Sequence, residues 1–125
     1  MYSLNPHLDN ALSFLNSNQI FPSMQMYRSR YFQDETFAAL QLIEPVVAKH
    51  NLTLIEVALR WVVNHSILKF TDGGNDGIIL GVSSLSQLQT NLEALEKGPL
   101  PQEVVDILDE AWNTLFKGRS PLYWR

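Results

Sequence analysis

Four polar side chains follow a short apolar run in the second half of the chain, in a pattern that suits the binding of an anion. They are Ser83, Ser84, Gln87 and Asn91, and Gly81 precedes them. Ser84 and Gln87 are three residues apart, which predicts a reciprocal cap at the start of a helix. The start of a helix carries partial positive charge and free backbone N–H groups, and these bind phosphate. The segment therefore has two interpretations, a capped surface helix without a ligand or a site for a phosphate group.

A strand and a helix must hold these side chains in place. The apolar run over residues 78–81 is short and continuous, which predicts a central strand of a parallel sheet or barrel with both faces covered. The helix that follows is predicted over residues 85–97 and ends before Gly98. Its leucines recur at helical spacing on one face, and we expect that face to lie in the core. These leucines are Leu85, Leu88, Leu92 and Leu95.

Two further helices are predicted ahead of the strand. The first begins at Asp34, its N-cap, is kinked or restarted at Pro45, and ends near Asn51. The second begins at Thr53, with Glu56 at the reciprocal capping position. The apolar residues of the second helix form a stripe that we expect to be buried. The stripe consists of Ile55, Ala58, Leu59 and Val62, with Trp61 beside them.

A last helix is predicted over residues 101–117, whereas residues 1–33 are predicted to be mostly irregular. Pro101 occupies a favoured first position of a helix, and Gly118 closes the same helix. The expected order over residues 34–125 is therefore helix, helix, strand, helix, helix. The core face of the last helix is expected to consist of Val104, Ile107, Leu108, Ala111, Trp112 and Leu115.

The composition excludes several classes of protein. The chain has 125 residues, of which 46% are hydrophobic and 18% charged, and this suits one domain or part of one. A net charge of −4 without a cluster of lysine or arginine argues against a nucleic-acid partner. Cysteine is absent, which excludes disulfides and thiolate metal sites. No apolar stretch reaches the roughly 20 residues of a membrane span, and the first residues do not resemble a signal peptide, so we expect a cytoplasmic protein without a membrane partner.

The three histidines are a possible source of metal ligands. His7, His50 and His65 match no metal-ligand spacing, and no acidic cluster accompanies them. His50 and His65 instead suit the C-terminal ends of helices, where a cation is favoured. We therefore predict no metal site.

Four segments in order resemble the C-terminal third of the aldo-keto reductases. Residues 48–61 are similar to the helix pair before the last barrel strand of that family, and residues 78–91 to the last strand and the cofactor helix. Residues 27–32 and 121–125 are similar to the aflatoxin-aldehyde reductase branch. The family fold is a (β/α)8 TIM barrel of about 250 residues. The resemblance therefore implies an α/β fold in which residues 1–125 form only the C-terminal part of an incomplete barrel, mostly α-helical with one or two short strands.

The resemblance also implies a cofactor, NADP(H). In the family, one segment holds the adenosine 2′-phosphate and the adenine, with hydroxyl and amide groups as donors. The matching residues here are Ser83, Ser84, Gln87 and Asn91. Asn5 resembles the start of a glycine-rich segment that lies along the cofactor pyrophosphate. Here Asp9 and other side chains replace the glycines, which opposes close approach of the backbone to phosphate.

Two residues match positions that contact the substrate in the aflatoxin-aldehyde reductase branch. They are Tyr27 and Arg30, and the arginine there pairs with a substrate carboxylate. The alternative is that Arg28 and Arg30 lie in a solvated loop while Tyr27, Tyr31 and Phe32 pack. The residues alone leave both interpretations open.

Complete members of the family reduce aldehydes or ketones with hydride from NADPH, and a tyrosine is the general acid. Their catalytic Asp, Tyr, Lys and His precede the segments matched here, so no catalytic residue is assigned. The resemblance therefore predicts part of a nucleotide site, a small carbonyl compound as the substrate of the complete enzyme, and a chain that is inactive alone. Secondary metabolism is the expected context. Two alternatives stay open: a non-catalytic helical module that associates through exposed apolar faces, or a truncated gene product without function.

Overall fold

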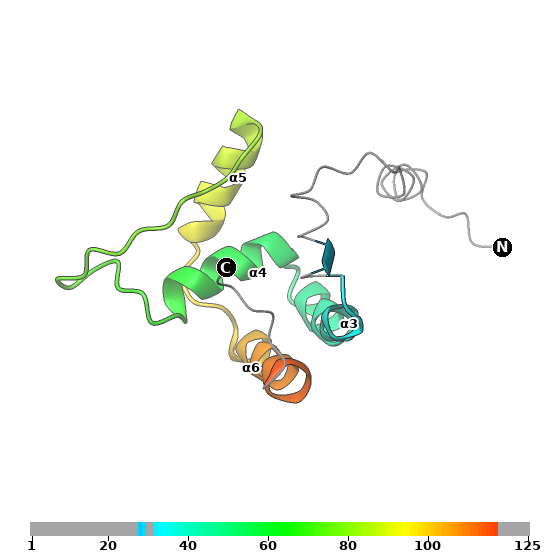
Figure 1. Ribbon diagram of the computed structural model, residues 1–125. Coiled ribbons are helices and arrows are strands. Elements are labelled where there is room, and N and C mark those ends of the chain that lie inside the picture. Colours follow the sequence, from blue (N-terminus) through cyan, green and yellow to red (C-terminus); the bar gives the residue numbers. More distant parts are fainter. Residues whose placement is uncertain (1–27, 30–31, 118–125) are drawn as a thin grey trace.

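The computed structural model describes residues 28–29 and 32–117, and every regular element in this part of the chain is helical (Figure 1). The elements are α3 (Asp34–Lys49), α4 (Leu54–Asn64), α5 (Leu85–Leu95), α6 (Gln102–Ala111) and the π-helical turn η1 (Trp112–Phe116). Three of the predicted site residues, Asn5, Tyr27 and Arg30, lie outside the described residues. The same holds for most of the region that was predicted to be irregular.

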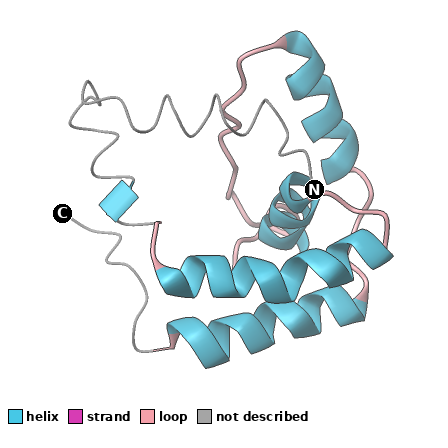
Figure 2. Ribbon diagram, turned by 90° about the vertical axis from the view of Figure 1, so that its right-hand side faces the viewer, coloured by secondary structure: helices cyan, strands magenta, loops and turns pink. Residues whose placement is uncertain are grey.

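The core lies where α3, α4 and α6 meet. α3 and α6 lie side by side, and α4 lies between this pair and α5 (Figures 1 and 2). The buried apolar cluster takes Val47 from α3, Val57 from α4 and Val104 from α6, and Leu100 from the segment before α6. The Val104 side chain is completely enclosed. This small core is built from three helices and the segment before α6.

Local sequence signals set the ends of the first two helices, largely as predicted. Thr53 is the N-cap of α4, and its Oγ1 accepts a hydrogen bond from the Glu56 N–H at 3.1 Å. α3 ends at Lys49, and Asn51 adopts φ +54°, a left-handed conformation that asparagine tolerates. The predicted N-cap Asp34 is wrong by one residue. Gln33 is the N-cap residue, although its side chain makes no capping bond to the helix, and Asp34 lies in the first turn, where a carboxylate suits the helix dipole.

Pro45 does not start a new turn. It lies inside α3, and the helix continues on both sides of it. Proline lacks the backbone N–H that an interior helical residue donates, so α3 carries one missing bond at this point. The prediction of a single helix that ends near residue 51 is confirmed, and the alternative of a restart is wrong.

The buried face of α4 differs from the predicted stripe. The structure buries Glu56, Val57 and Arg60, whereas Ile55 is 65% exposed and Ala58 is also exposed. The stripe was predicted from the positions of the apolar residues alone, without knowledge of which elements cover the helix. In the described part of the chain, α4 packs against helices, which cover its Val57 side.

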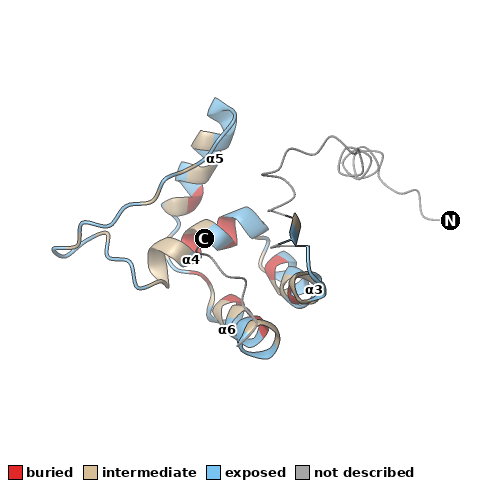
Figure 3. Cartoon of the chain, viewed as in Figure 1, coloured by how far each residue is buried: buried red, intermediate tan, exposed pale blue. Residues whose placement is uncertain are grey.

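The predicted strand over residues 78–81 and the leucine core face of α5 are also corrected. Residues 78–81 are irregular, and Ile79 is 100% exposed. A strand exists only when a neighbouring strand takes up its backbone hydrogen bonds, and the described residues supply none. Leu85 and Leu92 are 80% and 48% exposed for the same reason, since no sheet covers them. Figure 3 shows this region as mostly exposed.

The last helix follows the prediction more closely. Pro101 is the N-cap residue of α6, and helical structure continues to Phe116 through the π-helical turn η1. Val104 and Ala111 are buried as predicted, whereas Trp112 is exposed and stacks on Phe116 with ring centroids 6.0 Å apart. None of the described helices is long and apolar enough to cross a lipid bilayer.

Candidate functional site

The predicted phosphate-binding segment forms a capped helix start. Ser84 is the N-cap of α5, and its Oγ accepts a hydrogen bond from the Gln87 N–H at 3.2 Å. The reciprocal bond goes one residue further back than a standard capping box, because Gln87 Oε1 accepts from the Ser83 N–H at 2.9 Å. The Ser83 hydroxyl also donates to Gln87 Oε1, at 3.1 Å. The capping prediction is therefore confirmed, with Ser83 as an added member.

Two backbone donors at this helix start have no protein acceptor. Among the described residues, the N–H groups of Leu85 and Ser86 donate to no protein atom. The first N–H groups of a helix lack an intrahelical acceptor and carry its partial positive charge. Residues 83–87 are all exposed. The start of α5 therefore offers two accessible amide donors beside two serine hydroxyls, which suits an anionic oxygen.

A groove between α4 and α5 continues from this helix start. Its volume is about 340 Å³, within the range of about 300–1,000 Å³ that is usual for ligand pockets. Gln87 and Asn91 line it from α5, and Thr53 and Glu56 from α4, with Lys97 beyond the end of α5. The structure thus brings the predicted residues Gln87 and Asn91 into one groove. Ser83 and Ser84 lie at the start of α5 and do not line this groove.

A buried ion pair that was not predicted from the sequence joins α4 to the segment after α5. Arg60 Nη1 donates to Glu56 Oε1 at 2.9 Å, and both side chains are about nine-tenths buried. The same guanidinium donates to the carbonyl oxygens of Gly98 and Pro99. Lys97 Nζ lies 3.1 Å from Glu56 Oε1. Glutamate and arginine four residues apart are a recognisable helical pair, so this signal was present in the sequence.

This ion pair positions α5. Gly98 has φ +77°, a left-handed conformation, at the turn between α5 and α6. The Arg60 guanidinium binds the carbonyl oxygens of Gly98 and of the next residue, Pro99, so part-buried hydrogen bonds join α4 to the segment that follows α5. Because α5 packs chiefly on α4, the geometry of the groove depends on this contact.

His50 and His65 lie at the ends of α3 and α4, where the sequence predicted them. His50 Nε2 lies 2.8 Å from Glu103 Oε2, and Lys49 Nζ lies 2.7 Å from Glu103 Oε1. The hydrogen bond from Lys49, followed by that from His50, lowers the pKa of Glu103 from its ordinary value of 4.5. His65 Nε2 accepts a hydrogen bond from the Leu100 N–H at 2.9 Å, so both histidines join elements of the fold.

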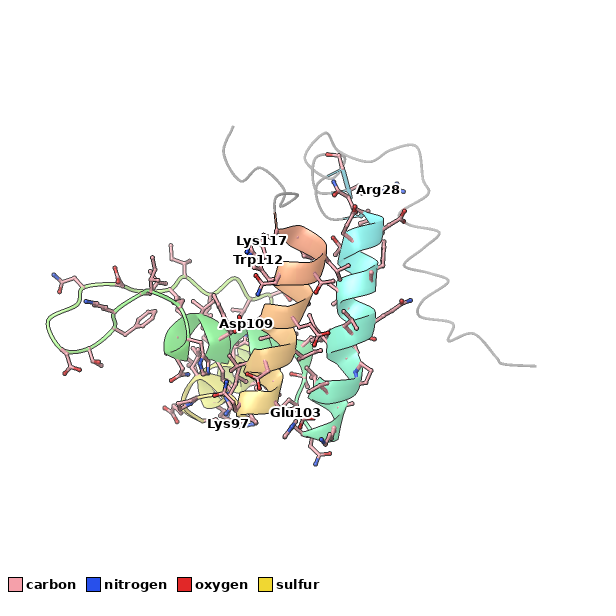
Figure 4. The ribbon with its side chains drawn as sticks, turned by 90° about the horizontal axis from the view of Figure 1, so that it is seen from below. Arg28, Lys97, Glu103, Asp109, Trp112 and Lys117 are labelled. Atoms are coloured by element: carbon pink, nitrogen blue, oxygen red, sulfur yellow. The ribbon has the colours of Figure 1, made fainter. Side chains whose placement is uncertain are left out.

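A second, apolar groove lies between α3, α4 and α6, and the sequence analysis did not single it out. Its volume is about 610 Å³, and Trp61 and Trp112 contribute to its lining together with Asp109. Figure 4 shows Asp109 and Trp112 on the side of α6 and η1 that faces α4. Glu103 lies at the other end of α6, beside the end of α3 (Figure 4).

Near the predicted substrate-contacting residues, the structure describes Arg28 and Phe32. The Arg28 guanidinium lies 5.8 Å from the centre of the Phe32 ring, a cation–π contact. The Phe32 ring meets the Phe37 ring edge-on at 5.6 Å. Phe32 is nevertheless 51% exposed, and Tyr27 and Arg30 lie outside the described residues, so both interpretations of this region stay predictions.

Comparisons with known proteins agree with the resemblance noted in the sequence. The sequence profile of the aldo/keto reductase family matches residues 7–113. An aldo-keto reductase of Pseudocercospora fijiensis is 42% identical over 97 residues, which are 78% of this chain and 32% of that protein. Aflatoxin B1 aldehyde reductase member 2 of Mus musculus is 40% identical over 105 residues, which are 81% of this chain and 28% of that protein. The chain thus spans about a third of the length of these curated relatives.

Proposed function

Because this chain belongs to the aldo/keto reductase family, we propose that it contributes the adenosine end of an NADP(H) site to a carbonyl-reducing enzyme. The observation that carries the proposal is the start of α5, where Leu85 and Ser86 are exposed and their amides have no acceptor among the described residues. Such groups bind the oxygens of a phosphate, and the helix dipole assists them. A cofactor with a 2′-phosphate matches this donor set.

Among the described residues, some would donate hydrogen bonds to the phosphate, and others would contact the adenine. The amides of Leu85 and Ser86, with the hydroxyls of Ser83 and Ser84, would hold the 2′-phosphate. The Gln87 side chain already accepts from Ser83 through Oε1, which leaves its Nε2 group to donate. Asn91 is half-buried in the α4–α5 groove and would contact the adenine. When bound, NADPH supplies the hydride for the carbonyl group, and these residues only bind and orient it.

We propose that the 125-residue chain alone does not catalyse the reduction. In the family, a tyrosine protonates the carbonyl oxygen while hydride arrives, and the resemblance locates that tyrosine outside the segments matched here. Nearby carboxylates oppose a phosphate, since Glu56 and Glu93 line the groove and Lys97 is already paired with Glu56. We therefore expect weak binding by the chain alone. The cytoplasmic location, the small carbonyl substrate and the context of secondary metabolism stay predictions.

A proline substitution tests the role of the Leu85 amide without disturbing the helix. Leu85 is the first residue of α5, a position that favours proline, and Ser84 before it is extended with φ −147° and ψ 157°, as proline requires. The change Leu85→Pro therefore removes one N–H donor and keeps the helix. Leu54→Pro is a matched control, because Leu54 is the first residue of α4 and follows an extended Thr53.

Affinity is measured by the change in NADPH fluorescence on titration, and NADH, which lacks the 2′-phosphate, is the reference ligand. We expect NADPH to bind more tightly than NADH. Loss of one hydrogen bond to a charged group costs about 1.5 kcal/mol, so Leu85→Pro should weaken NADPH binding by roughly tenfold and hardly affect NADH. Leu54→Pro should leave the affinities for NADPH and for NADH unchanged. Equal affinity for both nucleotides, or equal effects of both prolines, would contradict the proposal.

A further inference from the structure

The apolar groove between α3, α4 and α6 has a single charged side chain in its lining, the carboxylate of Asp109. The other lining residues are apolar, and two of them are the tryptophans Trp61 and Trp112. The groove has a volume of about 610 Å³, which suits a small organic molecule. Small-molecule pockets are typically apolar, with a few polar groups that orient the ligand. The lining therefore indicates a ligand with an apolar body and one group that complements a carboxylate.

The Asp109 carboxylate is available to a ligand in the described part of the chain. It is exposed and forms no ion pair with a described residue, and the groove lining contains no lysine, arginine or histidine. By contrast, Asp106 on the same helix accepts a hydrogen bond from the Gln102 side chain at 2.8 Å. A carboxylate on an apolar surface attracts a cation and repels a phosphate or another carboxylate. Asp109 therefore selects the charge of the ligand.

The tryptophans supply a second group that attracts a cation. Trp112 follows Asp109 by three residues, so the indole and the carboxylate lie on one face of the α6–η1 segment (Figure 4). The Trp112 ring stacks on Phe116 with an angle of 16° between the planes, and this contact orients the indole. Trp61 is 36% exposed and Trp112 is 53% exposed. The face of a tryptophan ring attracts a cation within about 6 Å, and more strongly than the other aromatic rings do.

We propose that this groove binds a lipophilic organic cation, an ammonium ion that carries an aromatic or aliphatic body, with Asp109 as its counter-ion. The ammonium group lies between the Asp109 carboxylate and the Trp112 ring, and the body lies on the apolar side chains of α3 and α4. A neutral ligand would cover the carboxylate without a compensating partner, which costs free energy. The groove shares no lining residue with the α4–α5 groove, so the inference goes beyond the proposed NADP(H) site and does not depend on it.

The test compares ligands that share one apolar body and differ in charge: 4-phenylbutylammonium, 4-phenylbutan-1-ol and 4-phenylbutanoate. Their binding to the 15N-labelled chain is followed through the indole N–H resonances of Trp61 and Trp112, which Trp61→Phe and Trp112→Phe assign. Asp109→Asn removes the proposed counter-ion. Glu110→Gln is the matched control, because Glu110 is exposed, is the next residue on α6 and does not line the groove. This control removes the same charge, so it corrects for the general attraction of a cation to a chain of net charge −4.

We expect the ammonium ion to bind roughly tenfold more tightly than the alcohol, because it adds an ion pair and a cation–π contact, and the carboxylate to bind least. Asp109→Asn should weaken binding of the ammonium ion by roughly fivefold and leave binding of the alcohol unchanged. Glu110→Gln should change either affinity by less than about twofold. Trp112→Leu keeps an apolar wall without the ring, so it should weaken the ammonium ion about threefold more than the alcohol.

Equal affinities for the ammonium ion and the alcohol would overturn the inference, since the groove would then select an apolar body regardless of charge. Equal effects of Asp109→Asn and Glu110→Gln would also overturn it, as would binding of the ammonium ion without a shift of the two indole resonances. Absence of binding would overturn it as well, and a dimer in sedimentation would then identify a second copy of the chain as the occupant. The NADP(H) proposal is tested at the start of α5, so the two proposals fail by different measurements.

Discussion

Arg60 connects two segments of the chain through one buried guanidinium. It binds the Glu56 carboxylate within α4 and the carbonyl oxygens of Gly98 and Pro99 beyond α5. The planar fork of arginine makes these three contacts in fixed directions, which a lysine does not reproduce. The Glu56–Arg60 spacing was readable from the sequence, but the carbonyl partners were not, because they depend on how the chain folds back 38 residues later.

Arg60→Met should lower the free energy of unfolding far more than the loss of an exposed ion pair does. The substitution leaves Glu56 buried without its main partner and two carbonyl oxygens without donors, which costs about 3–5 kcal/mol. The control Lys49→Met removes an exposed ion pair to Glu103 and should cost less than about 1 kcal/mol. Urea unfolding followed by circular dichroism measures both. Similar losses for the two variants would contradict the role assigned to Arg60.

At the scale of elements, helix ends were predictable, whereas the buried faces of α4 and α5 were not. Thr53 and Ser84 cap their helices through bonds to residues three positions ahead, so the signal and its effect are local. The exposure of Ile55 and Ile79 depends on elements distant in sequence, because an apolar stripe is buried only when another layer covers it. The strand prediction failed for the same reason, since pairing needs a neighbour.

The stability of the contact between α3 and α6 should depend on pH, because Glu103 joins the two helices. Its pKa lies below the ordinary value of 4.5, because Lys49 and His50 stabilise the carboxylate in the folded chain. The stability it adds is therefore present above about pH 4.5 and is lost as the pH falls through the lower, folded-state pKa. Glu103→Gln should reduce stability at pH 7, and this loss should shrink as the pH falls through the lowered pKa of Glu103.

Urea unfolding between pH 7 and pH 3 measures the free energy of unfolding of the wild type and of Glu103→Gln, and Glu110→Gln is the control. Glu110 is exposed and forms no ion pair among the described residues, so its variant should follow the wild type at every pH. A loss for Glu103→Gln that stays the same down to pH 3 would show that packing, rather than charge, explains the effect.

At the scale of the whole molecule, the described residues include only part of the proposed site. The start of α5 and the α4–α5 groove hold Ser83, Ser84, Gln87 and Asn91, whereas Asn5, Tyr27 and Arg30 lie outside the described residues. The family was recognisable from the sequence, because its segments keep their order along the chain. The apolar groove between α3, α4 and α6 was not, because it is formed by side chains from three helices that meet only after folding.

The purified 125-residue chain should not oxidise NADPH in the presence of small aldehydes. We expect its rate to equal that of the buffer alone, because no group in the matched segments is assigned as the proton donor. The complete Pseudocercospora fijiensis relative is the control for assay conditions. Turnover by the 125-residue chain clearly above the blank would contradict the assignment of an incomplete site.

The most direct measurement follows the backbone amide resonances of the 15N-labelled chain during titration with adenosine 2′,5′-bisphosphate, and with AMP as the reference. The start of α5 is proposed to hold the 2′-phosphate, so we expect the Leu85 and Ser86 amides to shift with the bisphosphate and to remain nearly in place with AMP. Shifts of the same size with both ligands, or none at these two amides, would contradict a 2′-phosphate site at this helix start.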